Sequence, residues 1–188
     1  MRIVKKPEER KAEMIAVADH FFERQGFLQT TVSEIVGTMD VAKGLFYYYF
    51  VTKDDVVREV VELRCQKLEE RIERIAQSRG SGREKLLQLA SEHLWADFLS
   101  RSMMEDLRKK QSAVLYQDMC DRVYRHIHKA VERILSQAFA EAGDNGEPVH
   151  EISGMAIYGF LMMAREEGMS PSGMEQLLTL VDLRRRVA

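Results

Sequence analysis

The sequence TTVSEIVGTMDVAKGLFYYYFVTK, residues 30–53, decides how the rest of this chain folds. Its first half carries one apolar stripe at helical spacing, and its second half is rich in aromatic residues. Asp40 lies between the halves, and Asp tolerates the left-handed backbone of a tight turn better than most residues. The stretch therefore predicts two short helices joined by a turn, which is the layout of a helix-turn-helix.

Two capping boxes mark helix starts in and just after this stretch. Thr31 is followed three residues later by Glu34, and Thr52 is followed three residues later by Asp55. In this motif the hydroxyl and the carboxylate each satisfy one backbone N–H that a helix start leaves unpaired. The first box predicts a helix over about residues 32–39, and the second predicts a helix that begins at residue 53.

The second short helix, about residues 42–49, has more aromatic side chains than a small core needs. One set can form a buried seam: Leu45, Phe46, Tyr49 and Phe50. The remaining set is left to face outward: Lys43, Gly44, Tyr47 and Tyr48. A Tyr hydroxyl can donate to a phosphate while the ring covers the sugar, and a Gly lets the backbone approach a groove closely. Lys53 at the start of the next helix adds a cation where free N–H groups also favour phosphate.

At these residues the sequence resembles the TetR family of one-component bacterial transcription regulators. Three motifs carry the resemblance, in the family's order and at its spacing: T-T-V-x-x-I at 30–35, V-A-K-G-L-F-Y-Y-Y-F at 41–50 and T-K-D-D-V at 52–56. They follow an amphipathic helix that ends with Q-G-F at residues 25–27. The resemblance covers about the first 60 residues, and the rest of the chain matches only in helical character and length.

Three positions depart from the family pattern. The family commonly has Gly at the position of Asp40, Ser at the position of Ala42 and His at the position of Tyr49. Ala42 cannot cap the second helix as Ser would, so either Asp40 caps it or the cap is lost. A carboxylate at Asp40 would weaken phosphate binding if it points toward DNA.

The resemblance implies an all-α fold in two parts. Residues 1–52 form an N-terminal three-helix helix-turn-helix DNA-binding domain, and residues 53–188 form a larger helical ligand-binding and dimerisation domain. Residues 53–78 are its connecting helix. The apolar spacing and the Gly-rich turns predict an initial helix at 7–25 and later helices at 83–99, 103–110, 113–142, 148–167 and 172–186.

Composition limits the other classes of protein. The longest apolar run, residues 155–164, is shorter than the roughly 20 residues of a membrane span. The N-terminus lacks the apolar core of a signal peptide, so a cytoplasmic location is expected. Cys65 and Cys120 lack metal-type spacing, so we expect free thiols and no metal site.

The formal charge of −2 argues against a generic nucleic-acid binder. Residues 1–55 hold eight Lys and Arg against nine Asp and Glu, a net charge of −1. Positive charge must therefore be placed at particular sites, namely Lys5, Lys6, Lys43 and Lys53. We expect few phosphate neutralisations and a shallow dependence of binding on salt.

Methionine and aromatic residues gather in the middle helices, where members of the family usually hold a small-molecule pocket. Such side chains adapt to varied ligands, although ordinary core packing is the favoured alternative for each residue taken singly. The ligand-binding candidates are Trp95, Phe98, Met103, Leu107, Tyr116, Met119 and Tyr124.

The expected helix at 148–167 is apolar on every face, which predicts burial on every face. A second copy of the chain is the simplest cover, through a four-helix dimer bundle that also uses the last helix. The alternative is that this helix forms the centre of a monomeric bundle. The dimer-interface candidates are Gly154, Ile157, Tyr158, Leu161, Met174, Leu178 and Val181.

The predicted function is therefore a sequence-specific transcriptional regulator of the repressor type, which binds a palindromic operator as a homodimer and responds to an unknown small-molecule inducer. The expected DNA-binding residues are Thr31, Ser33, Lys43, Gly44, Leu45, Tyr47, Tyr48, Tyr49 and Lys53. The alternative is an all-helical small-molecule-binding protein or enzyme without DNA binding. No catalytic motif and no cofactor is predicted. One hypothesis for induction is that the inducer shifts the connecting helix and changes the spacing of the two recognition helices, which solution distance measurements can test.

Overall fold

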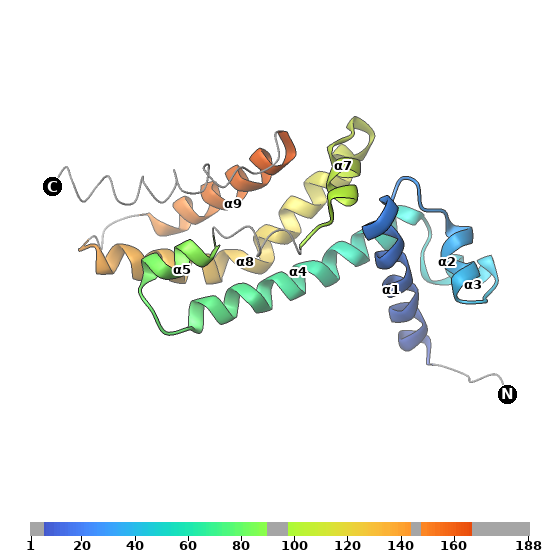
Figure 1. Ribbon diagram of the computed structural model, residues 1–188, viewed down its shortest axis with the longest axis horizontal. Helices are drawn as coiled ribbons and strands as arrows, with labels where there is room; N and C mark the ends of the chain where they lie inside the picture. Colours follow the sequence, from blue (N-terminus) through green and yellow to red (C-terminus); the bar gives the residue numbers. More distant parts are fainter. Residues whose placement is uncertain (1–5, 90–97, 144–147, 167–188) are drawn as a thin grey trace. The chain divides into compact units, whose positions relative to one another are not determined.

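The computed structural model describes residues 6–89, 98–143 and 148–166, and in these ranges the secondary structure is helical, without a strand. Figure 1 shows the elements: α1 (Pro7–Gln25), α2 (Val32–Thr38), α3 (Lys43–Tyr49), α4 (Lys53–Gln77), α5 (Gly82–Leu89), α7 (Arg101–Arg108), the 3₁₀ turn η1 (Lys110–Ser112), α8 (Ala113–Glu141) and α9 (Val149–Glu166). The predicted all-α fold class is confirmed. Within the same ranges, none of the helices combines the length and the apolar character that crossing a bilayer requires.

Helix α1 begins and ends where the sequence predicts. Pro7 occupies its first turn, where a missing backbone N–H has no intrahelical partner to lose. The helix ends because Gly26 adopts a φ of 80° and donates its N–H to the Phe22 carbonyl at 3.0 Å. Met14, Ala18 and Phe22 are completely buried, so α1 offers one apolar face to the helices that pack on it.

Helices α2 and α3 form the predicted helix-turn-helix (Figure 1). Asp40 lies in the turn between them with a φ of 51°, the left-handed conformation expected of it. Ala42 precedes α3 and makes no side-chain hydrogen bond to it. Of the two alternatives for this helix start, the second is therefore correct: α3 begins without a side-chain cap.

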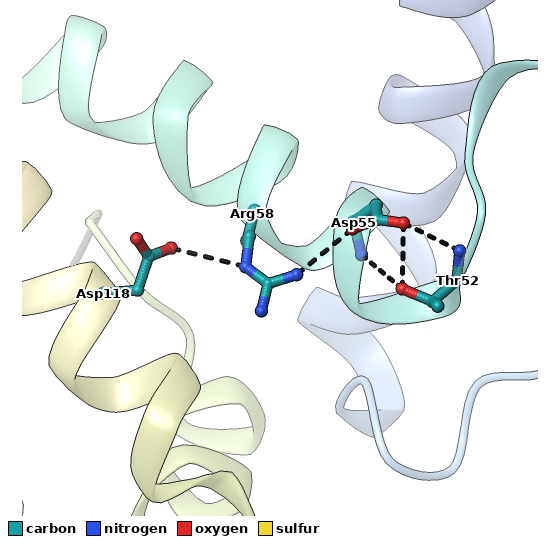
Figure 2. A network of polar contacts seen from close by, with 4 residues as sticks. All are labelled: Thr52, Asp55, Arg58 and Asp118. Carbon is teal, nitrogen blue, oxygen red and sulfur yellow. Dashed lines mark hydrogen bonds and ion pairs between the residues drawn. The ribbon is translucent and has the colours of Figure 1, made fainter.

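The predicted capping box at the start of α4 is present (Figure 2). The Thr52 N–H donates to Asp55 Oδ2 at 2.8 Å, and the Asp55 N–H donates to Thr52 Oγ1 at 3.2 Å. The Arg58 guanidinium donates to the other Asp55 oxygen at 3.2 Å and lies 3.6 Å from an Asp118 carboxylate oxygen in α8. The first turn of α4 is thereby linked to a second helix.

The N-terminal half of α4 is fixed against α1. Val56 and Val60 are completely buried, and Arg64, four residues further on, has a side chain that is only 8% exposed. Its guanidinium donates from Nε to Asp19 Oδ1 at 2.8 Å and pairs through Nη2 with the same oxygen at 2.6 Å. A cation this deeply buried needs such a partner, because an unpaired one would be costly to desolvate.

The structure divides the chain into two compact units, and the division does not fall at one point of the sequence. The first, which we call the reader unit, comprises residues 1–64 and 99–119, and the second unit comprises residues 65–98 and 120–188. The reader unit therefore contains α7 and η1 as well as α1, α2, α3 and the first half of α4. The predicted domain boundary between residues 52 and 53 stays a prediction, while the structure groups α7 with α1, α2 and α3 in one compact unit.

In the second unit, α5 lies very close to α8. A Cβ at Gly82 would lie 2.3 Å from the backbone nitrogen of Ala138, so this position accepts only Gly. Lys85 is buried and donates its ammonium to the Ala76 carbonyl and to Gln137 Oε1, each at 2.8 Å. Gly82 is the first residue of α5, which therefore begins one residue before the predicted start at residue 83.

Several predicted features lie outside the described residues. These are the helix at 172–186 and the side chains of Trp95, Met174, Leu178 and Val181.

The intact α4 cap should make stability depend on pH, and loss of the cap should remove part of this dependence. The pKa of Asp55 is lowered, chiefly because the Thr52 N–H donates to its carboxylate and then because the Thr52 hydroxyl does. A group with a lowered folded-state pKa stabilises the fold above its unfolded-state pKa of about 3.9, and this contribution disappears as the pH falls through the folded-state value. Thr52→Ala should lower the free energy of unfolding by about 1 kcal/mol near neutral pH, and by less at about pH 3.

Urea unfolding across this pH range measures the difference. Thr52→Ser keeps a hydroxyl at the same position, so it is the matched control and should retain the native pH dependence. A Thr52→Ala deficit of constant size at every pH would show that the cap does not depend on the Asp55 charge.

Candidate nucleic-acid interface

The four residues of α3 that were predicted to face outward are exposed. Tyr48 is 74% exposed and Tyr47 is 57% exposed, and Lys43 and Gly44 are exposed one helical turn earlier. Residues four apart lie on the same side of a helix, so Lys43 is a neighbour of Tyr47 and Gly44 is a neighbour of Tyr48. One side of a seven-residue helix thus presents a cation, an uncovered stretch of backbone and two phenols.

Two phenylalanines hold α3 on the reader unit. Phe46 is completely buried, Phe50 is 3% exposed, and their ring centroids are 5.5 Å apart. The Lys11 ammonium of α1 lies 5.6 Å from the centroid of the Phe50 ring and pairs with Glu59 of α4 at 2.6 Å. Through Lys11, the residue that ends α3 is thereby linked to both α1 and α4.

Leu45 and Tyr49 lie between the buried and the exposed sides of α3, and both are half-buried. The Tyr49 ring meets the Tyr48 ring edge-on at 4.9 Å and lies 6.4 Å from the Phe50 ring. Tyr49 therefore has a structural role, because its ring packs against the Tyr48 and Phe50 rings. Its contact with a phosphate stays a prediction.

On α2, Thr31 and Ser33 are exposed. Thr31 Oγ1 accepts the Glu34 N–H at 3.2 Å, and both the Thr31 N–H and its hydroxyl donate to Glu34 Oε2 at 2.7 Å. These bonds lower the pKa of Glu34, and the hydroxyl contributes most. The capping box predicted for α2 is confirmed, and it occupies the Thr31 hydroxyl that was also predicted to contact DNA.

The structure gives Lys53 an internal role that the sequence did not indicate. Its half-buried side chain donates to the Leu28 carbonyl at 3.2 Å and to the Thr30 carbonyl at 2.9 Å. Two of the three ammonium N–H groups are thus used within the reader unit. A phosphate contact from Lys53 stays a prediction, whereas its link from α4 to the loop before α2 is observed.

Val51 is an exposed residue beside α3 that sequence reasoning missed. It is 83% exposed in the short loop between α3 and α4. An apolar residue in a loop belongs to no helical stripe, so periodicity gives no indication of which way it faces.

The described ligand-binding candidates are mostly core residues. Phe98 is 6% exposed in the second unit, and Tyr124 there is half-buried. The others belong to the reader unit and are at most 1% exposed: Met103, Leu107, Tyr116 and Met119. Their burial is what the alternative of ordinary core packing predicts, and a pocket formed by these residues stays a prediction.

The predicted dimer-interface residues on α9 include two whose side chains are buried within the chain. Ile157 and Leu161 are 4% and 3% exposed, so these two predicted interface residues already pack within their own chain. Met155 and Met162, which the set of candidates omitted, are 67% and 38% exposed. Helical spacing explains the correction, since residues 157 and 161 share one side of the helix and residues 155 and 162 share another.

The two remaining described candidates on α9 are partly covered within the chain. The Tyr158 hydroxyl donates to Asp121 Oδ1 of α8 at 3.0 Å, and its ring stacks on Tyr124 at 5.3 Å. Burial raises the pKa of Tyr158, and the hydrogen bond to Asp121 raises it further. Gly154 faces the Tyr124 ring, which lies 3.7 Å from where a Cβ would be.

Comparison with known proteins agrees with this geometry. The family model for bacterial regulatory proteins of the tetR family matches residues 14–60. HbdR, an HTH-type transcriptional regulator from Aromatoleum sp. (strain CIB), is 34% identical over 70 residues, which are 35% of this chain and 31% of HbdR. TtgR, an HTH-type transcriptional regulator from Pseudomonas putida, is 25% identical over 172 residues, which are 85% of this chain and 80% of TtgR.

A solved structure extends the likeness in fold. A transcriptional regulator of the TetR/AcrR family from Thermobifida fusca has a TM-score of 0.60 and 22% identity, and the match covers 92% of this chain and 96% of that one. The family model falls on the helices that bury Phe46 and expose Tyr47 and Tyr48. Over residues 14–60, which include the helix-turn-helix, the chain is therefore similar to bacterial regulatory proteins of the tetR family.

Proposed function

We propose that this chain is a ligand-responsive transcriptional repressor that binds a palindromic operator as a homodimer. The observation that carries the proposal is the two-sided character of α3, with Phe46 buried and Tyr47 and Tyr48 exposed. Exposed phenols add little to the core of a folded monomer. On a helix that lies in the major groove they can contact the sugar-phosphate backbone and the base edges.

The chemistry of α3 favours shape and apolar contact over bidentate hydrogen bonding. Residues 43–50 contain no Arg, Asn or Gln, which are the side chains that pair with two atoms of one base. Lys43, Gly44, Leu45 and Tyr48 are our candidates for base edges. Ser33, Tyr47 and Tyr49 are our candidates for the sugar-phosphate backbone, where a hydroxyl can donate without reading sequence.

The alternative function is a helical small-molecule-binding protein or enzyme without DNA binding. This alternative explains equally well why the Met and aromatic side chains of the middle helices are buried. It does not explain why Tyr47 and Tyr48 of α3 are exposed. A mobility-shift assay with the native chain separates the two functions. The proposed function predicts that one particular duplex is retarded, whereas the alternative predicts no sequence-specific retardation.

Tyr48→Ala should weaken operator binding by roughly 10- to 100-fold, because loss of a base contact typically costs about 1–3 kcal/mol. The measurement is a mobility shift with a duplex selected from a random library by the native chain. Val114→Ala is the matched control, since Val114 is also 74% exposed but lies at the start of α8. Both variants should unfold at the native urea concentration. Native affinity in Tyr48→Ala would remove Tyr48 from the interface.

Lys43 and Lys53 should behave differently toward salt. Each phosphate neutralised contributes about −0.9 to the slope of the logarithm of the binding constant against the logarithm of salt concentration. Lys43→Gln should make this slope shallower by about 1 without changing stability, because an ammonium at a base edge in the groove also displaces counterions from the phosphates beside it. Lys53→Gln should instead lower the free energy of unfolding by about 1–3 kcal/mol, because it leaves the Leu28 and Thr30 carbonyls without their donor.

Titration of operator binding at several salt concentrations, together with urea unfolding, checks both variants. A slope change in Lys53→Gln with unchanged stability would reverse the assignment and restore Lys53 as a phosphate contact.

The outer side of α9 is our proposed dimer contact. Met155, Gly159 and Met162 are exposed, and they recur at the spacing of one helical stripe. An exposed Met stripe on an otherwise apolar helix is suited to pack against its own copy across a twofold axis. A twofold dimer is also what a palindromic operator requires, because its two half-sites lie about 34 Å apart, the spacing of successive major grooves on one side of DNA.

Met155→Glu should therefore raise the dimer dissociation constant by roughly 10-fold or more, because a charge at the contact would lose its hydration. Sedimentation velocity over a range of protein concentrations measures it. Leu87→Glu is the control, since Leu87 is an exposed apolar residue of α5 in the same unit. A Met155→Glu variant that dimerises like the native chain would exclude this side of α9 from the interface.

The effector is proposed only by class, as a small molecule that binds among the middle helices. Phe98 and Tyr124 are the described candidates that belong to the second unit. A thermal-shift screen of the full chain, followed by operator release with each hit, would identify it.

A further inference from the structure

A carboxylate of α7 is buried against the turn that connects α1 to α2. Asp106 is 4% exposed, and its Oδ2 accepts the Leu28 N–H at 2.8 Å. Its other oxygen lies 2.6 Å from the Lys109 ammonium, which is half exposed. Asp106 and Leu28 are 78 residues apart in sequence, so no local pattern connects them.

Gly26 makes room for this carboxylate. A Cβ at Gly26 would lie 2.3 Å from Asp106 Oδ2 and 3.3 Å from the Ser102 carbonyl oxygen of the same helix. Gly26 also has a φ of 80°, which other residues rarely adopt. Only Gly fits at the end of α1, because the Asp106 carboxylate and the α7 backbone already fill the space where a side chain would begin.

The turn that Asp106 contacts, residues 26–30, is also where the DNA-binding helices are joined. The Thr30 hydroxyl donates to the Gly26 carbonyl at 2.7 Å and closes the turn, and Thr30 is completely buried. Lys53 donates to the Leu28 and Thr30 carbonyls of the same turn from the first turn of α4. Helix α2 begins two residues after Thr30, so a shift of this turn displaces α2, and with it α3.

The segment that carries Asp106 is connected at both ends to the second unit. Residues 99–119 belong to the reader unit, but the segments on either side of them, residues 65–98 and 120–188, belong to the second unit. Helix α7 is therefore joined at both ends to the part of the chain that does not read DNA. A rearrangement in the second unit acts on α7 from both sides, and Asp106 is the buried polar contact through which α7 holds the turn at residues 26–30.

We propose that Asp106 is a positioning residue that couples the second unit to the DNA-reading helices through its hydrogen bond to the Leu28 N–H. This inference rests on the proposed function. It names the one hydrogen bond that carries the coupling. Loss of this bond should uncouple the two units, while α3 can still enter the groove of DNA. Because coupling is reciprocal, DNA bound at α3 must also stabilise α7, although α7 itself is not part of the proposed interface.

Amide hydrogen exchange of the full chain tests this, with and without a duplex selected from a random library by the native chain. In the native chain, duplex binding should slow exchange in α7 by roughly 5- to 150-fold, the usual range of coupling between sites. In Asp106→Ala the slowing should persist in α2 and α3 and disappear in α7. Operator affinity should fall by about tenfold, the effect of losing one hydrogen bond to a charged group.

Two further variants separate coupling from general stability. Asp106→Asn keeps an oxygen that can accept the Leu28 N–H, so it should restore the response of α7 to DNA. Glu105→Ala is the matched control, because Glu105 is the preceding acid on α7, has a side chain that is 54% exposed and pairs only with Arg101 in the described contacts. It should respond like the native chain. If Asp106→Ala does not fold, the response of α7 to the duplex in the native chain still decides.

The possible failures are distinct. Exchange in α7 that ignores the duplex in the native chain, while α3 is protected, would overturn the coupling and leave the proposed function intact. The same holds if Asp106→Ala retains the native response in α7. A native chain that selects no duplex from the library would instead overturn the proposed function.

Discussion

The burial of Phe46 and Phe50 is the interaction on which the DNA-reading surface depends. Helix α3 has seven residues and starts without a side-chain cap, so neither its length nor its first turn keeps it helical. Packing must do so. Once Phe46 is fixed in the core, helical geometry directs Tyr47 and Tyr48 outward, because successive side chains point in different directions around the axis. One buried ring thus determines the orientation of the whole exposed surface.

The acidic residues of the reader unit are mostly committed to structure, which explains how a segment without excess positive charge can approach DNA. Glu34 and Asp55 start α2 and α4, at the positive ends of those helices. Asp19 neutralises the buried Arg64, and Asp106 accepts a backbone N–H. Backbone dipoles or a cation face each of these carboxylates. A simple count of charges therefore overstates the repulsion that a phosphate backbone would meet at α3.

The sequence predicts the features that neighbouring residues determine. The bounds of α1 and α4, the two capping boxes and the turn at Asp40 all depend on residues within about four positions of one another, and all are confirmed. The same holds for the exposed side of α3. Sequence reasoning was less successful where distant segments decide. The role of Lys53 depends on carbonyls 23 and 25 residues away, and the inward orientation of Ile157 and Leu161 depends on which side of an apolar helix meets the rest of its unit.

The same limit explains why the α1–α2 turn is prominent only in the structure. Its sequence resembles any loop after a helix, yet Lys53 of α4 and Asp106 of α7 both bind its backbone, at carbonyls and at an N–H respectively. A backbone held by side chains can be released without unfolding a helix, since each side chain contributes one or two hydrogen bonds. The position of α3 is thus determined by packing below it and by a few polar contacts behind it. Packing resists change, whereas the polar contacts can be exchanged for water at small cost. We therefore propose that control of DNA binding in this chain lies at the turn and not at the recognition helix.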